Sequence, residues 1–220
     1  IDSHNIPLIL RKFIEFIEIK IINFSYCTVI CTEQRIEQIH KAKPNNVLVI
    51  HNSPDLDCLD DILEEYDYVY CGMLNDLRLI EEILLEYKNH QNLKFCFVGS
   101  GKYEDLLRDI SNQFQNFTYF DSLPYNQVLE IEMKSKVLSA IYNPIIRNHR
   151  LCAPNKFYEA LALKKPIIVC KGTGIDKIVS KYDLGEIIDY DVNQFYVKLE
   201  KIIQNDERKL HGEIGRKLYE

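Results

Sequence analysis

The sequence contains no apolar run long enough to cross a bilayer, and it carries no excess of basic residues. The segment Ile17–Phe24 is apolar, but two charged residues, Glu18 and Lys20, interrupt it. The 27 lysines and arginines are outnumbered by 33 aspartates and glutamates, which gives a net charge of -6 at pH 7. A protein that binds nucleic acid normally presents a basic surface, so we expect no nucleic-acid partner.

Metal-ligand spacings are also missing. The seven cysteines are scattered without a Cys-x-x-Cys pair, and cysteine and histidine are not clustered at the spacing of a zinc site. Cys31, Cys71, Cys96 and Cys170 fall in apolar runs with the character of strands. These features predict buried, reduced thiols in a cytoplasmic protein, and they predict no metal site.

The glycine pattern lacks two common nucleotide fingerprints. Gly99–Lys102 holds two glycines, but a phosphate loop of the Walker type would also need glycine at position 96, which is Cys96. The dinucleotide fingerprint would need glycine at position 104, which is Glu104. An NTPase or a dehydrogenase is therefore not expected. We interpret the glycines as a tight turn from strand to helix, with Ser100 helping to cap that helix.

Short apolar strands alternate with amphipathic helices, in a chain that is 46% hydrophobic and 27% charged. This alternation predicts an α/β fold with a Rossmann-like doubly wound parallel sheet. The expected strands are Thr28–Cys31, Val47–Ile50, Tyr68–Cys71, Lys94–Val98, Phe117–Phe120, Ser139–Tyr142, Pro166–Cys170 and Glu186–Ile188. The expected helices are Ile6–Ile22, Glu33–Lys41, Asp76–Asn89, Lys102–Phe114, Asn126–Met133, Asn155–Leu163, Gly174–Tyr182 and Val192–Ile203, with a last helix beginning near Asp206.

A boundary is expected at the turn-forming cluster Asn52–Asp55. From Tyr68 onward there are enough strands and helices for a complete doubly wound domain, whereas the residues before the boundary form only a partial N-terminal βα segment. No signal peptide is visible and residue 1 is Ile1 rather than Met. We therefore expect the chain to begin inside a longer protein, or to have lost a leader.

The stretch Cys152–Cys170 predicts a turn, a helix and a buried strand. Pro154 can start the helix, because its missing N–H would be unsatisfied there anyway. Asn155 and Lys156 then occupy the first turn, where free N–H groups and the helix dipole attract an anion. Glu159 lies one turn further in, where its carboxylate can accept from ribose hydroxyls. The segment suits a nucleotide sugar; the alternative is an ordinary amphipathic helix of an α/β domain.

The segments Pro154–Ala162 and Lys165–Ile168 together resemble the donor-binding signature of GT-B glycosyltransferases of the family 4 type. The resemblance extends from about Asn52 to Gly185. It implies a retaining transfer from a nucleoside diphosphate sugar to a glycan or lipid-linked acceptor, without a cofactor or a metal. It also implies a cytoplasmic enzyme of bacterial surface polysaccharide synthesis, such as capsule or lipopolysaccharide. Such an enzyme can associate peripherally with the inner face of the membrane, and its oligomeric state stays open.

Enzymes of this family have two facing Rossmann-like domains, and the resemblance assigns this chain to parts of both. Residues 1–52 look like the tail of a truncated N-terminal domain, and Val49–Asp55 looks like the crossing segment. Residues 53–220 look like the C-terminal nucleotide-sugar-binding domain. A fragment of this kind is expected to bind a nucleotide but to turn over poorly alone. The alternative is a short protein with an N-terminal helical extension.

The resemblance also implies contacts to the donor diphosphate. The segment that begins at Gly72 resembles a Gly-Arg-x-x-x-x-Lys motif whose two cations clamp the diphosphate. Gly72 would allow close backbone approach, and Arg78 stands where the second cation belongs. Met73 stands where the first cation is expected, which removes one phosphate contact. Alternatively, Arg78 is a surface charge on the expected helix Asp76–Asn89.

Further loops at the same edge of the sheet carry candidates. In the family, the loop equivalent to Asp121–Asn126 touches the nucleotide base, largely through backbone groups. Tyr125 could stack on that base, or it could pack on its neighbours instead. The polar loop Arg147–Arg150 could meet phosphate or an acidic sugar, with a solvated charged loop as the alternative. Lys171, which follows another expected strand, could also reach a phosphate.

The resemblance implies that Arg78, Lys156 and the N–H groups near Asn155 stabilise the departing diphosphate. It also implies that Glu159 binds the ribose. Many relatives carry another glutamate eight positions before the one that matches Glu159, and in this sequence that position is Leu151. No catalytic residue is assignable. Two other functions stay open. One is a non-catalytic nucleotide-binding or assembly module, which Met73 and Leu151 favour because they replace a cation and a glutamate. The other is a nucleotide-sugar epimerase, for which no acid/base set is found.

Overall fold

The computed structural model describes residues 7–54 and 62–220 of the chain. The chain divides into two compact units, Ile1–Asn52 and Ser53–Glu220. Several sequence-based expectations reach outside the described residues. The helix expected over Ile6–Ile22 loses its first residue in this way, and the boundary cluster Asn52–Asp55 and the crossing segment Val49–Asp55 both lose their last.

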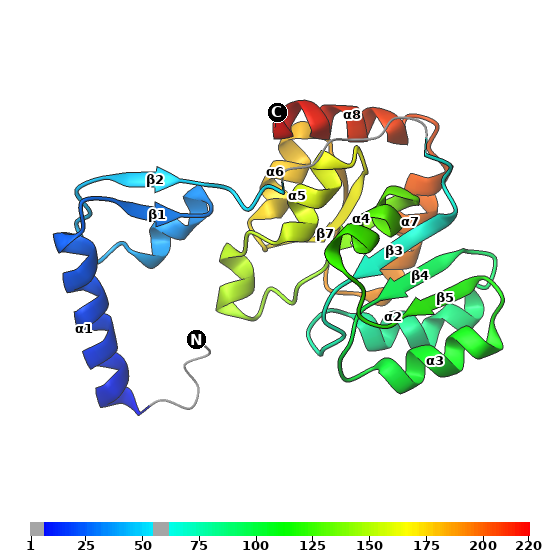
Figure 1. Ribbon diagram of the computed structural model, residues 1–220, viewed down its shortest axis with the longest axis horizontal. Coiled ribbons are helices and arrows are strands. Elements are labelled where there is room, and N and C mark those ends of the chain that lie inside the picture. Colours follow the sequence, from blue (N-terminus) through cyan, green and yellow to red (C-terminus); the bar gives the residue numbers. More distant parts are fainter. Residues whose placement is uncertain (1–6, 55–61) are drawn as a thin grey trace. The chain divides into compact units, whose positions relative to one another are not determined.

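The first unit contains two short parallel strands (Figure 1). Its elements are α1 (Leu8–Phe24), β1 (Thr28–Ile30), the 3₁₀ helix η2 (Glu33–Gln38) and β2 (Val47–Val49). Thr28 of β1 lies opposite Val47 of β2. The helix expected over Glu33–Lys41 is shorter and has 3₁₀ winding. Beyond it, Lys41 forms an ion pair of 2.5 Å with Glu15 of α1, which holds the connection against that helix.

The second unit is a six-stranded parallel sheet with helices packed on it (Figure 1). Its strands are β3 (Tyr66–Cys71), β4 (Phe95–Val98), β5 (Phe117–Phe120), β6 (Ser135–Ala140), β7 (Ile167–Cys170) and β8 (Gly185–Ile188). Its helices are α2 (Ile80–Glu86), η3 (Tyr87–Asn89), α3 (Glu104–Gln113), α4 (Tyr125–Met133), η4 (Arg147–Leu151), α5 (Asn155–Ala162), α6 (Ile175–Tyr182), α7 (Val192–Gln204) and α8 (Arg208–Tyr219). The Rossmann-like parallel sheet expected from the sequence is confirmed.

The strand order is β5-β4-β3-β6-β7-β8, so the direction of winding reverses between β3 and β6. From β3 the chain moves outward through β4 to β5, and it then returns to β6 and moves outward on the other side. The connections that leave β3 and β6 therefore diverge, and a crevice opens between them at the carboxyl ends of the strands. This reversal point is where a doubly wound sheet binds its ligand.

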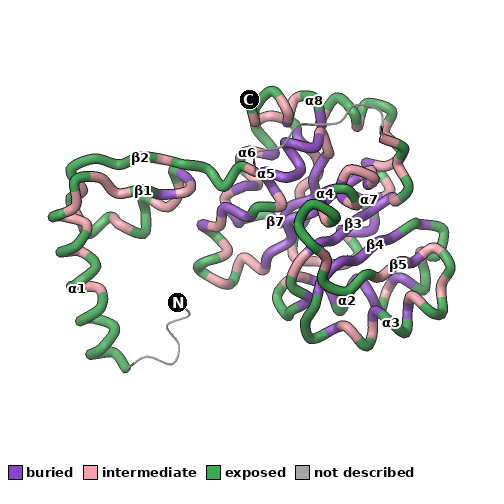
Figure 2. The backbone as a smooth tube through the Cα atoms, in the orientation of Figure 1, coloured by how far each residue is buried: buried purple, intermediate pink, exposed green. Residues whose placement is uncertain are grey.

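The strands are apolar along most of their length because helices cover both faces of the sheet. Every residue of β4 and of β7 is buried, and Figure 2 shows the buried backbone concentrated in the sheet. One face carries an aromatic core, in which the ring of Tyr68 lies 5.1 Å from those of Phe95 and Phe195. Helices α2, α3 and α7 complete this core, whereas α4 contacts β3 and β6 from outside it.

Strand β6 differs from the expectation. It spans Ser135–Ala140, whereas the apolar pattern predicted Ser139–Tyr142. The strand can begin with a buried polar residue because the hydroxyl of Ser135 donates to the backbone carbonyl of Glu132 at 2.8 Å. Tyr142 is buried but lies beyond the paired part of the strand, so burial alone misplaced the element by several residues.

Helix α2 also begins later than expected, at Ile80 instead of Asp76. Leu77 and Leu79 have φ values of 67° and 60°, and left-handed residues cannot continue a right-handed helix. The hydroxyl of Tyr190 accepts a hydrogen bond of 2.8 Å from the backbone N–H of Leu79, which helps to hold this turn. Arg78, which lies between the two leucines, is therefore in a loop at the end of β3.

Candidate functional site

A pocket of about 470 Å³ opens at the reversal point between β3 and β6. Residues from the ends of β3 and β4, the loop after β5, and helices α4 and α5 line it. Six of the seven residues expected to bind a donor line the pocket, namely Gly72, Arg78, Tyr125, Asn155, Lys156 and Glu159. The seventh, Pro154, is buried and precedes α5 as its N-cap residue. Loops far apart in the sequence thus meet where the topology places a ligand.

Two glycines allow the backbone at the end of β3 to pack closely. Gly72 has a φ of 137°, and a Cβ atom there would lie 2.5 Å from Nζ of Lys156. A Cβ atom at Gly99 would lie only 2.0 Å from the carbonyl oxygen of Gly72. A side chain is therefore excluded at Gly99 by the backbone, whereas at Gly72 it would displace the flexible end of Lys156 and adopt a strained φ. Gly72 was expected to admit a ligand, and its lack of a side chain also makes room for the ammonium of Lys156.

Lys156 places a half-buried ammonium in the pocket from the first turn of α5. Its Nζ lies 4.9 Å from the centre of the Tyr70 ring, within cation–π distance. Burial lowers the pKa of Lys156, because desolvation disfavours the charged form. Among the residues that the structure describes, no direct ion pair of Lys156 is found. An anionic ligand would supply the counter-charge that this ammonium lacks.

Glu159 is buried, and its Oε1 accepts a hydrogen bond of 2.9 Å from the hydroxyl of Tyr125. Burial, together with the carboxylate of Glu159, raises the pKa of Tyr125, so that its hydroxyl stays a donor. The residue as a whole is 51% exposed at the rim of the pocket. Tyr125 therefore contacts a neighbour, as the packing interpretation expected, while its exposed face remains accessible to a base. Oε2 of Glu159 remains to accept from a ligand hydroxyl.

Arg78 lies in the loop between β3 and α2, so the interpretation as a surface charge on a helix from Asp76 to Asn89 is wrong. The guanidinium carbon lies 4.1 Å from the centre of the Tyr142 ring. His149 contacts the same ring edge-on, with a centroid separation of 5.3 Å. Stacking on the ring holds the guanidinium at the wall of the pocket.

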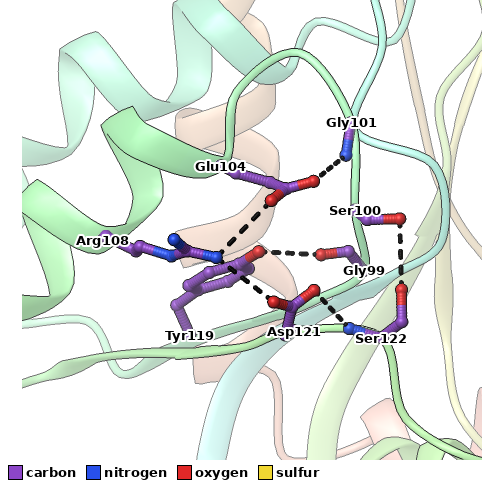
Figure 3. A network of polar contacts seen from close by, with 8 residues as sticks. All are labelled: Gly99, Ser100, Gly101, Glu104, Arg108, Tyr119, Asp121 and Ser122. Carbon is purple, nitrogen blue, oxygen red and sulfur yellow. Dashed lines mark hydrogen bonds and ion pairs between the residues drawn. The ribbon is translucent and has the colours of Figure 1, made fainter.

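A polar network at the rim joins the loops that follow β4 and β5 (Figure 3). Arg108 of α3 reaches Asp121 at 3.2 Å and Glu104 at 3.5 Å. The hydroxyls of Ser100 and Ser122, which both line the pocket, lie 3.1 Å apart. Ser100 was expected to cap the following helix, but α3 begins at Glu104 with Tyr103 as its N-cap residue and has no side-chain cap. The network fixes the wall where the resemblance places the base.

Glu132 is a pocket residue that the sequence analysis missed. It lies near the end of α4, is only 2% exposed and lines the pocket. Burial and the nearby charge of Glu159 raise the pKa of Glu132 to about 8. The signal in the sequence was its helical spacing from the buried Leu129, three residues earlier, because a carboxylate on the apolar face of a helix is uncommon.

Other expected candidates lie apart from this pocket. Within the described chain, no residue of Arg147–Arg150 lines it, and this loop forms the short helix η4. Lys171 lines a separate surface groove together with Lys177 and Lys181 of α6. Leu151, which stands where relatives carry a glutamate, is buried. The candidate residues that line the pocket thus come from the loops and helices at the reversal point.

The described parts of the chain hold no group of three or more cysteine, histidine, aspartate or glutamate residues arranged to bind a metal ion. The same residues form no helix with the length and apolar character needed to cross a membrane.

No protein-family model matches the chain, and no curated protein matches its sequence. Solved structures do match. TarM of S. aureus has a TM-score of 0.66 at 17% identity, over 93% of this chain and 42% of TarM. WaaG, a glycosyltransferase involved in lipopolysaccharide biosynthesis, has a TM-score of 0.66 at 14% identity, over 99% of this chain and 66% of WaaG. The pneumococcal O-GlcNAc transferase GtfA, solved with UDP and GlcNAc, has a TM-score of 0.65 at 14% identity, over 88% of this chain and 41% of GtfA.

The chain therefore has the fold of glycosyltransferases, and the GT-B-type architecture expected from the resemblance is confirmed. At identities of 11% to 17% the likeness establishes the fold. The chain spans 41% to 66% of the length of the three structures named above.

Proposed function

We propose that the second unit binds the nucleoside diphosphate part of a nucleotide sugar. The protein is then a glycosyltransferase that transfers the sugar to a glycan or lipid-linked acceptor. The observation that carries this proposal is the convergence of Arg78, Lys156 and the buried Glu159 in one pocket at the carboxyl ends of the strands. Structures of the same fold solved with UDP support a nucleoside diphosphate as the ligand class.

In this function the two cations, Arg78 and Lys156, bind the diphosphate. Arg78, stacked on Tyr142, offers two parallel N–H donors, and Lys156 adds a point charge beside the N–H groups at the start of α5. Glu159 accepts from the ribose hydroxyls. When the bond between the anomeric carbon and the diphosphate oxygen breaks, the electron pair stays on the diphosphate, and the cations stabilise that charge.

The finer parts of the proposal follow the resemblance. The transfer retains the configuration of the sugar, and it needs no metal because protein cations stabilise the leaving diphosphate. The setting is bacterial surface polysaccharide synthesis in the cytoplasm, with the full-length enzyme at the inner face of the membrane. WaaG, whose fold the chain shares, supports a setting of this kind through its own role in lipopolysaccharide biosynthesis.

A non-catalytic nucleotide-binding module is the second candidate, because two positions depart from the pattern that the chain resembles. Met73 is 62% exposed at the pocket, where a cation is expected, and Leu151 is buried where a glutamate is expected. Release of free sugar from a nucleotide sugar separates the two candidates. A transferase hydrolyses its donor slowly when the acceptor is absent, whereas a module releases no sugar.

The binding experiment is calorimetric titration of the chain with UDP, GDP, ADP and CDP. We expect one of them to bind saturably, and Glu159→Ala to weaken that binding by about 1–3 kcal/mol, the range for a lost hydrogen bond to a charged group. Glu130→Ala is the matched control, because Glu130 is exposed on α4. Unchanged affinity in Glu159→Ala contradicts the ribose contact, and failure of all four nucleotides to bind contradicts the nucleotide site.

A further inference from the structure

Glu132 is an ionisable residue that lines the pocket, and the proposed function gives it no role. Its side chain is more than nine-tenths buried, and its Oε2 has no hydrogen-bond partner among the described residues. Buried polar atoms are nearly always partnered, so an unpartnered carboxyl oxygen in a ligand-sized pocket requires an explanation. Glu130, two residues earlier on the same helix, is exposed instead.

The carboxyl of Glu132 and the ammonium of Lys156 meet at the end of β3. Glu132 interacts with the thiol of Cys71, and Nζ of Lys156 lies so close to Gly72 that a Cβ atom there would approach it to 2.5 Å. Cys71 and Gly72 are consecutive, so Glu132 and Lys156 approach neighbouring residues at the end of one strand. The positive and negative groups influence each other there, although no direct ion pair joins them.

The ionisable surroundings of Glu132 come from every element packed against α4. Within α4, the hydroxyl of Tyr125 donates to Glu159 in the pocket. The strands β3 and β6, which contact α4, carry Asp67 and Lys136, and these two side chains pair with each other at 2.7 Å. The groups that act on Glu132 directly are Cys71 of β3 and Lys156 and Glu159 of α5. A second carboxylate in the same pocket opposes ionisation of Glu132, and Lys156 favours it.

We propose that Glu132 is a positioning residue for Lys156: its carboxyl packs beside the ammonium and, as a neutral acid, leaves that charge free for a diphosphate group. This role rests on the proposed function, because it concerns the same ligand. The neutral acid fills the space beside Lys156 without adding a negative charge. An ionised Glu132 would instead neutralise the ammonium and repel the diphosphate.

The role predicts a pH dependence of binding. Burial raises the pKa of Glu132 to about 8, so the acid is mostly neutral at pH 7 and mostly ionised at pH 9. Because the neutral form is the one that favours the diphosphate, affinity falls as the pH rises through this region. If only the neutral form binds, the affinity at pH 9 is roughly a tenth of that at pH 7, since about one molecule in ten still carries the proton one unit above the pKa.

The test compares the wild type with Glu132→Gln, which keeps the shape of the neutral acid but cannot ionise. Whichever of UDP, GDP, ADP and CDP binds the wild type is titrated at pH 7, 8 and 9 by calorimetry. We expect Glu132→Gln to bind within about threefold of the wild type at pH 7 and to decline clearly less than the wild type by pH 9. Some decline remains in both proteins, because burial lowers the pKa of Lys156 and its ammonium loses charge as the pH rises. The control Glu130→Gln should decline with the wild type, and a parallel decline in Glu132→Gln overturns the proposal.

A second measurement needs no ligand. The side-chain carboxyl carbon of Glu132 is followed by NMR during a pH titration of the wild type and of Lys156→Met. We expect a midpoint near 8 that moves upward in Lys156→Met, because the ammonium favours the ionised acid; an unmoved midpoint overturns the pairing. A wild type that binds none of the four nucleotides overturns the proposed function and this role together, whereas parallel pH declines overturn only the role of Glu132.

Discussion

Replacing Gly72 by alanine should weaken diphosphate binding by displacing Lys156. The new Cβ atom would lie 2.5 Å from Nζ, and because Cβ is fixed to the backbone, the flexible lysine must move. A φ of 137° is also unfavourable for alanine and costs roughly 1–3 kcal/mol of unfolding free energy. Loss of one charged hydrogen bond to the diphosphate weakens binding by about 1.5–3 kcal/mol, roughly tenfold to a hundredfold in Kd.

The control for Gly72→Ala is Gly172→Ala. Gly172 also has a positive φ, 81°, but a Cβ atom there would have its nearest neighbour at 3.5 Å, on Pro144. Both substitutions should lower Tm, by roughly 2–4 °C for each kcal/mol of stability lost in a unit of this size. Only Gly72→Ala should weaken binding of the nucleoside diphosphate, as measured by calorimetry.

The mechanism of the Gly72→Ala effect can be separated from simple strain. In a Lys156→Met background, the alanine should cause little further loss of affinity, because the displaced group is already gone. Additive losses would refute the argument that the glycine acts through Lys156. So would a Gly72→Ala protein that loses stability but binds the diphosphate as tightly as the wild type does.

Two further predictions concern Arg78 and Glu64. In calorimetry, Arg78→Ala should weaken binding of a nucleoside diphosphate more than binding of the monophosphate, because the guanidinium contacts the second phosphate. Equal losses of affinity would contradict this role. Burial opposes ionisation of Glu64, but two hydrogen bonds from Arg208, at 2.8 and 2.5 Å, outweigh it and lower the pKa of Glu64. Its stabilisation is therefore present above the pKa of the unfolded chain and is lost as the pH falls through the lower folded value. In denaturant titrations Glu64→Gln should cost about 1–3 kcal/mol at pH 7 and less below pH 4, and a cost independent of pH would be evidence against the pair.

The sheet could be predicted from the sequence because parallel strands covered on both faces appear as short apolar runs between helices. β4 and β7, which are buried throughout, are within one residue of their expected bounds. The start of α2 could not be predicted, because leucine itself gives no signal for positive φ. The turn at Leu79 depends on Tyr190, more than a hundred residues away in the sequence.

The pocket shows the same division between local and distant information. Arg78, Lys156 and Glu159 could be named because each follows a strand or opens a helix, and these are places that local patterns identify. Glu132 could not be named in this way, because it lies at the far end of its helix and reaches the pocket only through the packing of α4 on the sheet. The reason for glycine at position 72 likewise depends on a lysine that lies far along the chain.

The charges of the pocket connect these observations. Its lining holds two cations, Arg78 and Lys156, and two carboxyl groups, Glu132 and Glu159. If both carboxyl groups were ionised, the four charges would cancel, and the pocket would have little attraction for a diphosphate. A neutral Glu132 restores one net positive charge, which partly makes up for the cation that Met73 replaces. On the proposed function, an unusual buried acid and a missing cation are therefore parts of one electrostatic balance, and the affinity of the pocket depends on keeping Glu132 protonated.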